Sequence, residues 1–206
     1  MATTKTKIVN RAFTKVGSRA AVNIDTDDTE EARVALNLYD IALEEILSDT
    51  LWTFATKRAL LATTTDTVLF NVDDERLNVV YQRPADALRI FEVSDTAADW
   101  YEEEDKIISD TAGLGVRYVF LNTDPATYKP YFASAFSDLL AAHMAFPLLN
   151  SRSITGDLYD IYEKISLPKA KAENAQTGTA KEVDDNYWLN ARFGGPNVKE
   201  HGGPNA

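Results

Sequence analysis

The chain has 206 residues, 45% of them hydrophobic, and carries a formal net charge of −11. This length and hydrophobic content predict one globular domain, with or without an insertion, and exclude a wholly disordered chain. Cysteine is absent, which excludes disulfides, thiolate metal sites and a thiol nucleophile and is typical of a reducing cytosol. We find no run of about 18 apolar residues and no signal-peptide core, so we expect neither membrane insertion nor export.

The charge is unevenly spread along the chain. Residues 1–24 contain five basic residues and no acidic one, residues 25–50 contain nine acidic residues and one basic residue, and residues 61–124 contain fourteen acidic and five basic residues. Binding to nucleic acid requires lysine and arginine contacts to phosphate, so an acidic chain is a poor candidate for it. An acidic wall can still line a passage through which nucleic acid slides without being held.

A first helix is expected over residues 3–17, with Gly17 in the left-handed position that follows a helix end. Its apolar side chains recur on one helical stripe, which predicts that this stripe is buried. The stripe consists of Ile8, Val9, Ala12, Phe13 and Val16.

The stretch from Thr29 to Leu60 organises the rest of the chain. It is predicted to begin with an amphipathic helix of some 22 residues, ~33 Å long, which leads into a Trp-x-Phe turn. We expect Asp27 or Asp28 to cap the start, with the acids at positions 30 and 31 completing a capping box. The apolar or small residues of the predicted buried face are Ala32, Ala35, Leu36, Tyr39, Ala42, Leu43, Ile46 and Leu47.

Large aromatic residues are expected at a structural junction between helices and strands. Trp52 and Phe54 come directly after the long helix, where aromatic faces can close a core. Tyr81 and Tyr118, from two predicted strands, complete this junction. The segment 58–61 is expected to return the chain toward the core.

Residues 63–123 are expected to form a small antiparallel sheet inserted between helices. Short runs rich in β-branched and aromatic residues alternate here with Asp, Gly and Thr clusters. The segments 103–105 and 110–113 are expected to be hairpin turns. The predicted strand runs cover residues 68–70, 77–81, 88–93, 100–101, 106–108 and 116–121.

Two further helices are expected after the sheet. The first begins at Pro130 and runs to about Leu149, with Pro147 expected to end or kink it. The second covers residues 154–175, with a kink or break at Pro168. The predicted inward residues are Phe132, Ala135, Phe136, Leu139, Leu140, His143 and Met144 in the first of these helices and Leu158, Ile161, Tyr162 and Ile165 in the second.

From residue 177 onward the chain is polar and rich in glycine, so we expect an extended arm that is poorly ordered unless something binds it. Tyr187, Trp188 and Leu189, followed by Phe193, are its few large apolar residues. These are too few to fold alone. They are typical of a docking peptide, and a strap that folds back on its own domain is an equally good interpretation.

No motif in the sequence indicates catalysis. The HExxH, GxSxG, GxGxxG and Walker A patterns are absent, and the two glycines at 113 and 115 are interpreted as part of a turn. The acidic cluster 102–105 can in principle bind a cation or supply an acid–base pair. A solvated hairpin tip is the better interpretation, because consecutive strand residues point to opposite faces. We therefore expect no catalytic residue, no metal and no cofactor, and we interpret His143 as a core or interface residue.

Five phrases occur in order along nearly the whole chain. The first three are Ile8–Gly17, Leu51–Ala62 and Tyr81–Arg89. The fourth combines Val116–Val119, Asp124, Tyr131–Phe136 and Leu139–Ala145. The fifth, near the end of the chain, is Asn186–Arg192. Together they resemble the head-to-tail adaptor proteins of short-tailed bacteriophages, often called tail tubular protein A. The sequence departs from this family at Pro168, where such proteins usually continue the helix toward the arm.

The resemblance implies an α+β, mainly α, fold: an antiparallel helical bundle with an inserted small antiparallel β-sheet and an extended C-terminal arm. The predicted bundle covers residues 1–62 and 124–176, the insertion covers 63–123, and the arm covers 177–206. The arm residues expected to dock on a partner are Tyr187, Trp188, Arg192 and Phe193.

For function, the resemblance implies a structural virion component at the head–tail junction, made in the host cytoplasm. Twelve copies would form a ring below the portal protein, the ring would receive the tail nozzle protein, and tail fibres are a further expected contact. DNA would pass through the lumen without specific binding, and no catalysis or membrane is required. Two alternatives stay open: a tail-associated peptidoglycan hydrolase that uses the acidic cluster, and a monomeric helical regulatory domain.

Overall fold

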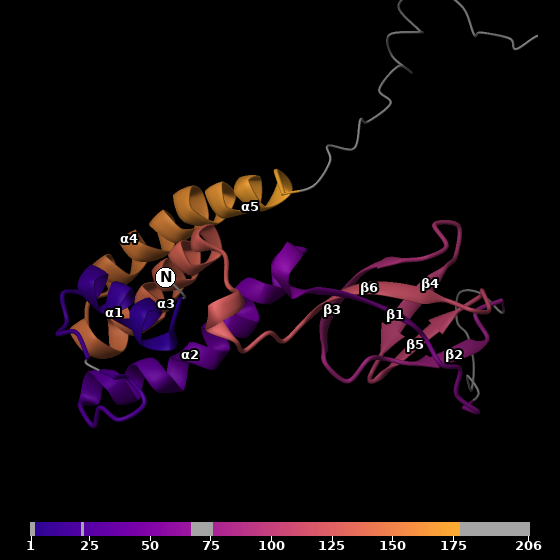
Figure 1. The fold of residues 1–206 in the computed structure, drawn as a ribbon, viewed down its shortest axis with the longest axis horizontal. Helices are drawn as coiled ribbons and strands as arrows, with labels where there is room; N and C mark the ends of the chain where they lie inside the picture. The colour runs from indigo at the N-terminus through magenta and orange to yellow at the C-terminus, as the bar shows by residue number, and fades with distance from the viewer. Residues whose placement is uncertain (1–2, 22, 67–75, 178–206) are drawn as a thin grey trace, which may run out of the picture.

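The computed structural model describes residues 3–21, 23–66 and 76–177. The molecule is elongated, with helices at one end and antiparallel strands at the other (Figure 1). The α+β class predicted from the sequence is therefore confirmed. The helices are α1 (Lys5–Val16), α2 (Glu30–Ser48), α3 (Pro130–Leu149), α4 (Arg152–Ile161) and α5 (Leu167–Ala175), and the strands are β1 (Thr56–Leu60), β2 (Val79–Gln82), β3 (Ala87–Val93), β4 (Trp100–Glu103), β5 (Lys106–Ser109) and β6 (Gly115–Phe120).

Helix α1 forms as its sequence predicts. The Thr4 hydroxyl accepts a hydrogen bond from the Lys7 amide at 3.3 Å and caps the start. Gly17 follows the last turn with φ of 80°, a left-handed conformation that glycine adopts without steric cost. All five residues of the predicted stripe are buried.

Helix α2 is shorter than predicted and has a different cap. It spans 19 residues and ends at Ser48. The cap is Thr29, whose hydroxyl accepts from the Ala32 amide at 3.3 Å, because Thr29 is the extended residue directly before the first turn. The Asp27 carboxylate accepts instead from the Thr29 amide at 3.0 Å. The predicted inner face is buried except for Leu36, which packs half-buried against the core.

Helix α3 is the centre of the helical part, and α1, α2, α4 and α5 all pack on it. Most of its side chains are buried, and this explains its apolar composition. Among the described residues, α3 is the one helix long and apolar enough to span a membrane, and 67% of the apolar window is buried inside the protein. Such burial is typical of a core helix.

Two prolines lie inside helical chain without ending it. Pro147 was expected to end or kink α3 near residue 146, but the helix continues to Leu149, because the proline lies in the last turn and removes one bond there. The chain also stays helical through Pro168. A π-helical turn, Tyr162–Ser166, precedes this proline, and the Leu167 amide bonds five residues back to the Tyr162 carbonyl. The wider turn accommodates the proline in the first turn of α5.

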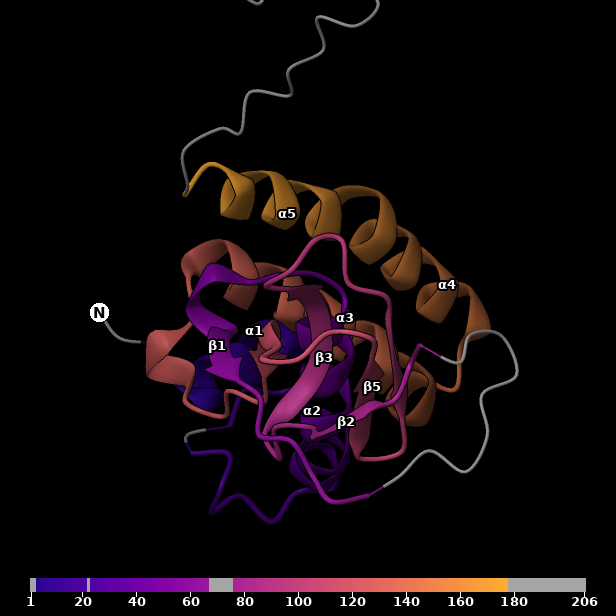
Figure 2. The ribbon, with the colours of Figure 1, turned by 90° about the vertical axis from the view of Figure 1, so that its right-hand side faces the viewer.

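The inner face predicted for the last helix is half wrong. Leu158 and Tyr162 are buried against the core, whereas Ile161 and Ile165 are exposed. Leu158 and Tyr162 are four residues apart and lie on the helix face that packs against the core, whereas Ile161 and Ile165 lie on the neighbouring face. Figure 2, which looks onto the sheet end, shows α4 and α5 passing along one side of the molecule.

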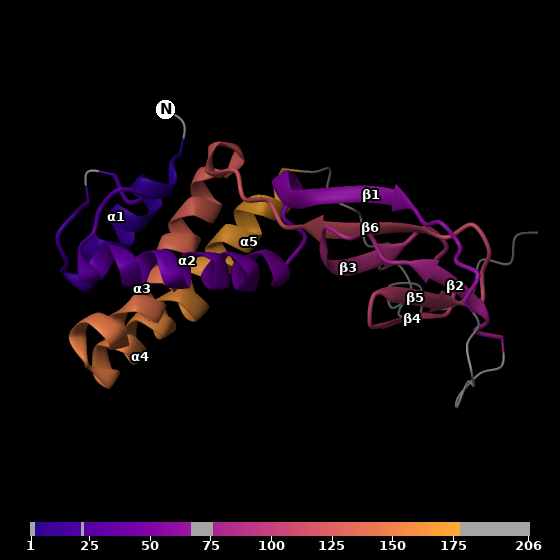
Figure 3. The same cartoon turned by 90° about the horizontal axis from the view of Figure 1, so that it is seen from below.

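The strands form two three-stranded antiparallel sheets instead of the single sheet expected. The strand orders are β1-β6-β3 and β2-β5-β4, and Figure 3 shows the sheets as two layers. A second apolar cluster lies between them and includes Tyr81, Ile107 and Tyr118. The strand run predicted at 68–70 lies outside the described residues.

The turns and the first strand add two corrections. Segment 103–105 does turn the β4–β5 hairpin, with Glu104 at φ of 53°. Segment 110–113 is not a hairpin turn, because β5 and β6 belong to different sheets, and this segment crosses between them. Residues 56–60 form the edge strand β1, so the segment expected to return to the core pairs with β6 instead.

Candidate interaction site

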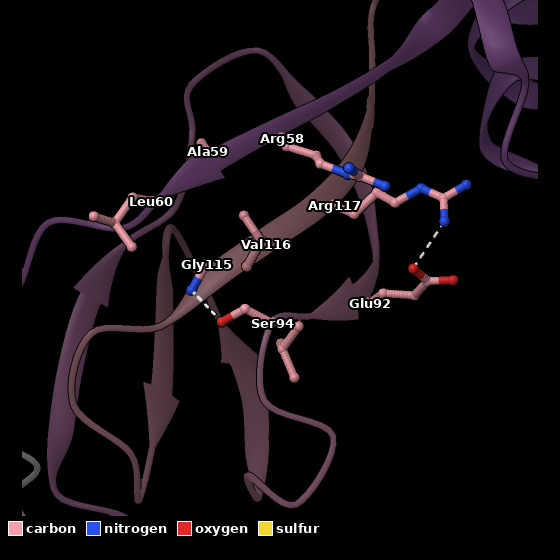
Figure 4. Close-up of a pocket in the computed structure, with 9 residues that line it drawn as sticks. Arg58, Ala59, Leu60, Glu92, Ser94, Gly115, Val116 and Arg117 are labelled. Carbon is pink, nitrogen blue, oxygen red and sulfur yellow. Dashed lines mark hydrogen bonds and ion pairs between the residues drawn. The ribbon is translucent and has the colours of Figure 1, made fainter.

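A hollow of about 400 Å³ lies on the outer face of the β1-β6-β3 sheet (Figure 4). Side chains alternate across a strand, so Val116 and Tyr118 of β6 face the cluster between the sheets while Gly115 and Arg117 face outward. Val119, also on the outer face, is buried in the helical core. The helices therefore cover the end of this face that contains Val119, and the end that contains Gly115 is open.

Two arginines dominate the charge of the hollow. Arg58 and Arg117 are cross-strand partners in the register of β1 and β6. The Arg117 guanidinium donates to the Glu92 carboxylate at 2.9 Å, whereas Arg58 has no ion-pair partner among the described residues. Figure 4 shows both guanidinium groups on the same side of the sheet. One carboxylate between two arginines gives this face a local positive charge in an acidic protein.

The floor of the hollow is made by a glycine. Gly115 lies between Leu60 of β1 and Ser94, which follows β3, and its amide donates to the Ser94 hydroxyl at 2.9 Å. A Cβ at this position would lie 3.4 Å from the Ser94 Cβ and would occupy the floor. Leu60 is 78% exposed at the rim. The site therefore offers cationic groups beside an apolar side chain, an arrangement that can bind an acidic and apolar segment.

The four predicted junction residues lie in two separate clusters. Trp52 is fully buried in the helical core, where its Nε1–H donates to the Ile46 carbonyl at 2.7 Å. Phe54 packs half-buried beside it. Tyr81 and Tyr118 lie between the two sheets instead. The structure thus brings Trp52 and Phe54 together, and Tyr81 and Tyr118 together, but not all four.

Polar contacts join the strands of the β1-β6-β3 sheet to one another and to the helices. The Lys57 ammonium contacts the Asp86 carboxylate at 2.6 Å, and the Tyr118 hydroxyl donates to the same carboxylate at 3.0 Å. The hydrogen bond from Lys57, with a further one from Tyr118, lowers the pKa of Asp86 below its usual value. Within the first half of β3, Arg89 Nη1 donates to the Ser48 carbonyl at 3.0 Å and so places a cation at the C-terminus of α2.

A buried polar cluster connects α1, α3 and the π turn. The Lys15 ammonium contacts the Asp138 carboxylate and donates to the Ser137 hydroxyl at 2.9 Å, and the Ser166 hydroxyl donates to Asp138 at 2.7 Å. Burial lowers the pKa of Lys15, against the opposing effect of Asp138. A serine beside a lysine is an arrangement used by some nucleophilic enzymes. Here Ser137 is fully buried, so no substrate can reach it, and the cluster has a structural role.

His143 is an interface residue, as expected. Its Nε2 lies 2.8 Å from the Glu45 carboxylate of α2, and its Nδ1 lies 3.2 Å from the Tyr159 hydroxyl of α4. The ring also packs edge-on against Tyr159. His143 therefore links α2, α3 and α4 at the half-buried surface of the helical part.

The acidic cluster 102–105 lies on the exposed β4–β5 hairpin. The Arg83 guanidinium approaches the Glu102 carboxylate at 3.9 Å. No group of His, Asp and Glu side chains within residues 3–21, 23–66 and 76–177 could hold a metal ion. The four arm residues predicted to dock on a partner lie outside the described part of the chain.

Comparison with known proteins adds no family to these observations. No family model matches the chain, and no curated protein matches it either. The assignment of function therefore depends on the residues themselves and on where the fold places them.

The hollow itself was not predicted from the sequence. The segment Lys57-Arg58-Ala59-Leu60 has two polar residues followed by two apolar ones, so it lacks the alternation that signals a strand. It is also short, and its partner β6 lies more than fifty residues further along the chain. The two glycines at 113 and 115 also have different roles: Gly113 is in a turn with φ of 77°, and Gly115 begins β6.

Proposed function

We propose that this chain is a structural head-to-tail adaptor of a short-tailed phage virion. Copies of it form a ring between the portal and the tail nozzle, and DNA passes through the centre. The helices form an antiparallel bundle, the two sheets form the inserted part, and the C-terminal arm docks on a neighbouring copy or on the portal. The ring acts by binding and positioning its partners, so it uses no catalytic residue, metal or cofactor.

The observation that carries this proposal is where the family-like phrases lie in the fold. Three of the four phrases within the described residues contain residues that join one element of the fold to the next. The first forms α1 and its glycine cap, and the second contains Trp52, which closes the helical core at the start of β1. The third contains Asp86 and Arg89, which tie the strands to one another and to α2. A resemblance that includes residues which set the architecture supports a shared architecture more strongly than the same number of matches at exposed positions.

The distribution of charge supports a passage for DNA. Asp40 and Glu44 are exposed on the solvent face of α2 and have no ion-pair partner within the described ranges. Several exposed cations are already paired with carboxylates, as in the contact of Arg33 with Asp28 at 2.7 Å. Clustered free cations are what phosphate binding needs. An acidic lumen wall repels phosphates and lets DNA slide past.

Sedimentation with the portal protein of the same phage tests this function. We expect the full-length chain to co-sediment with portal rings, and Trp188→Ala with Phe193→Ala to reduce the co-sedimenting fraction strongly. The exposed-residue variant Ile41→Ser, on α2, serves as a control and is expected to leave it unchanged. A full-length chain that stays at the top of the gradient as a monomer in the presence of portal would contradict the proposal and favour a monomeric regulatory domain.

A further inference from the structure

Strand β1 has an open edge. In the described part of the chain it pairs only with β6. The Leu61 amide donates to the Leu114 carbonyl at 2.9 Å. Backbone groups alternate in direction along an antiparallel pair, so the N–H and C=O groups of Arg58 and Leu60 point away from β6. An open strand edge of this kind is a template for a further strand, and proteins commonly cover it.

The surface beside this edge indicates which side chains a covering segment needs. Within the described residues, Arg58 has no ion-pair partner, whereas Arg117 is paired with Glu92. Leu60 beside them is 78% exposed. A segment that places carboxylates next to large apolar side chains would complement both features. The carboxylates would pair with the guanidinium groups, and an apolar side chain would cover Leu60 above the glycine floor.

The described part of the chain ends beside β1. Near the end of α5, the Asn174 Oδ1 accepts from the Thr53 amide at 3.0 Å, and its Nδ2 donates to the Leu51 carbonyl at 2.7 Å. The Thr177 hydroxyl donates to the Asn174 carbonyl at 2.6 Å. Asn174 itself is buried. Asn174, three residues before the end of the described chain, is therefore held against Thr53, which lies three residues before β1 begins, and Figure 3 shows the end of α5 beside the start of β1.

The chain that continues from this point has the required composition and length. Asp184 and Asp185 precede Tyr187, Trp188 and Leu189 with one residue between the two groups. Seven residues separate positions 177 and 184, which allows a reach of up to roughly 24 Å when extended. The five residues from Thr53 to Arg58 span at most ~18 Å. The acidic and aromatic segment can therefore reach the edge of β1 in its own chain.

We propose that in the free protein the segment Asp184–Leu189 covers the open edge of β1 of its own chain as an added strand. The carboxylate on the outer face of the added strand pairs with Arg58 and Arg117, and the aromatic side chain on that same face covers Leu60. The segment thereby closes an edge that would otherwise pair with other molecules. This inference does not rest on the proposed adaptor function, since it concerns the isolated chain.

Hydrogen–deuterium exchange of the full-length protein, resolved to single amides, tests this contact. The amides of Arg58 and Leu60 point away from β6, so only an added strand can protect them. We expect both to exchange at least about tenfold faster in Tyr187→Ser with Trp188→Ser than in the unaltered chain. The amides of Lys57 and Ala59, which bond to β6, should exchange alike in both proteins. Equal rates at Arg58 and Leu60 in the two proteins would overturn the proposal.

A charge reversal and a dilution series complete the test. Arg58→Glu should remove the protection of the Leu60 amide, whereas the matched reversal Arg152→Glu, exposed on α4, should not. Protection in the unaltered chain should be independent of protein concentration. Protection that disappears on dilution would assign the edge to the arm of a second copy and would overturn docking within one chain.

Discussion

Trp52 is a large, fully buried residue at the end of the helical core that lies next to the strands. Its ring packs against Tyr131 and Phe132 of α3, with centroids 6.4 and 5.0 Å away, and its Nε1–H is bonded to the last turns of α2. We expect Trp52→Ala to lower the free energy of unfolding by ~3–5 kcal/mol, because it removes a fully buried side chain. Denaturant titration measures this loss, and Trp100→Ala, on a half-buried residue of β4, should cost much less. A loss below about 1 kcal/mol would place Trp52 outside the core.

The Lys15–Asp138 pair is a second residue-scale case, because the side chains are only 24% and 10% exposed. Lys15→Met leaves a buried carboxylate without its cation and should cost about 3–5 kcal/mol of unfolding free energy. Adding Asp138→Leu should recover most of this loss. The exposed pair of Lys164 with Asp160, 2.6 Å apart, is the control, and Lys164→Met should cost less than about 1 kcal/mol. Equal losses at the two lysines would show that burial of the first pair is unimportant.

At the scale of elements, we expect the stability of the fold to depend on the buried face of α2 and not on its exposed face. Leu43 is 1% exposed and Ile41, two residues earlier, is 56% exposed. Leu43→Asp buries a charge without a partner, and we expect it to abolish soluble folding, since the cost is several kcal/mol of a total of about 5–15. Ile41→Asp should melt within a few degrees of the unaltered protein. Melting curves measured by circular dichroism decide this, and a folded Leu43→Asp would contradict the burial of this face.

The elements differ in how well the sequence predicts them, and the reason is physical. Helix α1 was predicted almost to the residue because its apolar stripe and its terminal glycine are local signals. The strands from β2 to β6 were found from composition for the same reason. Strand β1 was missed because its pairing with β6 is long-range. The π turn before Pro168 was missed because a proline in the sequence indicates that regular α-helical geometry is disturbed, but it does not indicate which local structure forms instead.

The candidate site was the least predictable feature. Its residues come from β1, β6 and the end of β3, which are distant in sequence, and one of them, Gly115, has no side chain. The sequence does contain the charged and apolar residues, but whether their side chains point outward depends on strand register. A register shift of one residue would turn these side chains to the opposite face of the sheet. The division into helical and inserted domains, and the docking role of Tyr187, Trp188, Arg192 and Phe193, stay predictions.

For the whole molecule, a net charge of −11 predicts weak interaction with DNA. The basic residues of α1 are partly used within the fold, since Lys15 pairs with Asp138 and Arg11 donates to the Ser134 hydroxyl at 2.7 Å. We expect no measurable binding of duplex DNA at ~150 mM salt, because few cations are free to release counterions. Fluorescence anisotropy with a labelled duplex measures this. A sub-micromolar dissociation constant at that salt would contradict the acidic passage and favour a nucleic-acid-binding role.

Electron microscopy of the full-length chain mixed with the portal protein of the same phage tests the central claim most directly. The proposal predicts particles in which a second ring of twelve-fold symmetry sits beneath the portal ring, with an open channel through both. Adding the chain with Leu43→Asp, which we expect not to fold, should leave bare portals. Bare portals beside free monomers of the unaltered, folded chain would contradict the account.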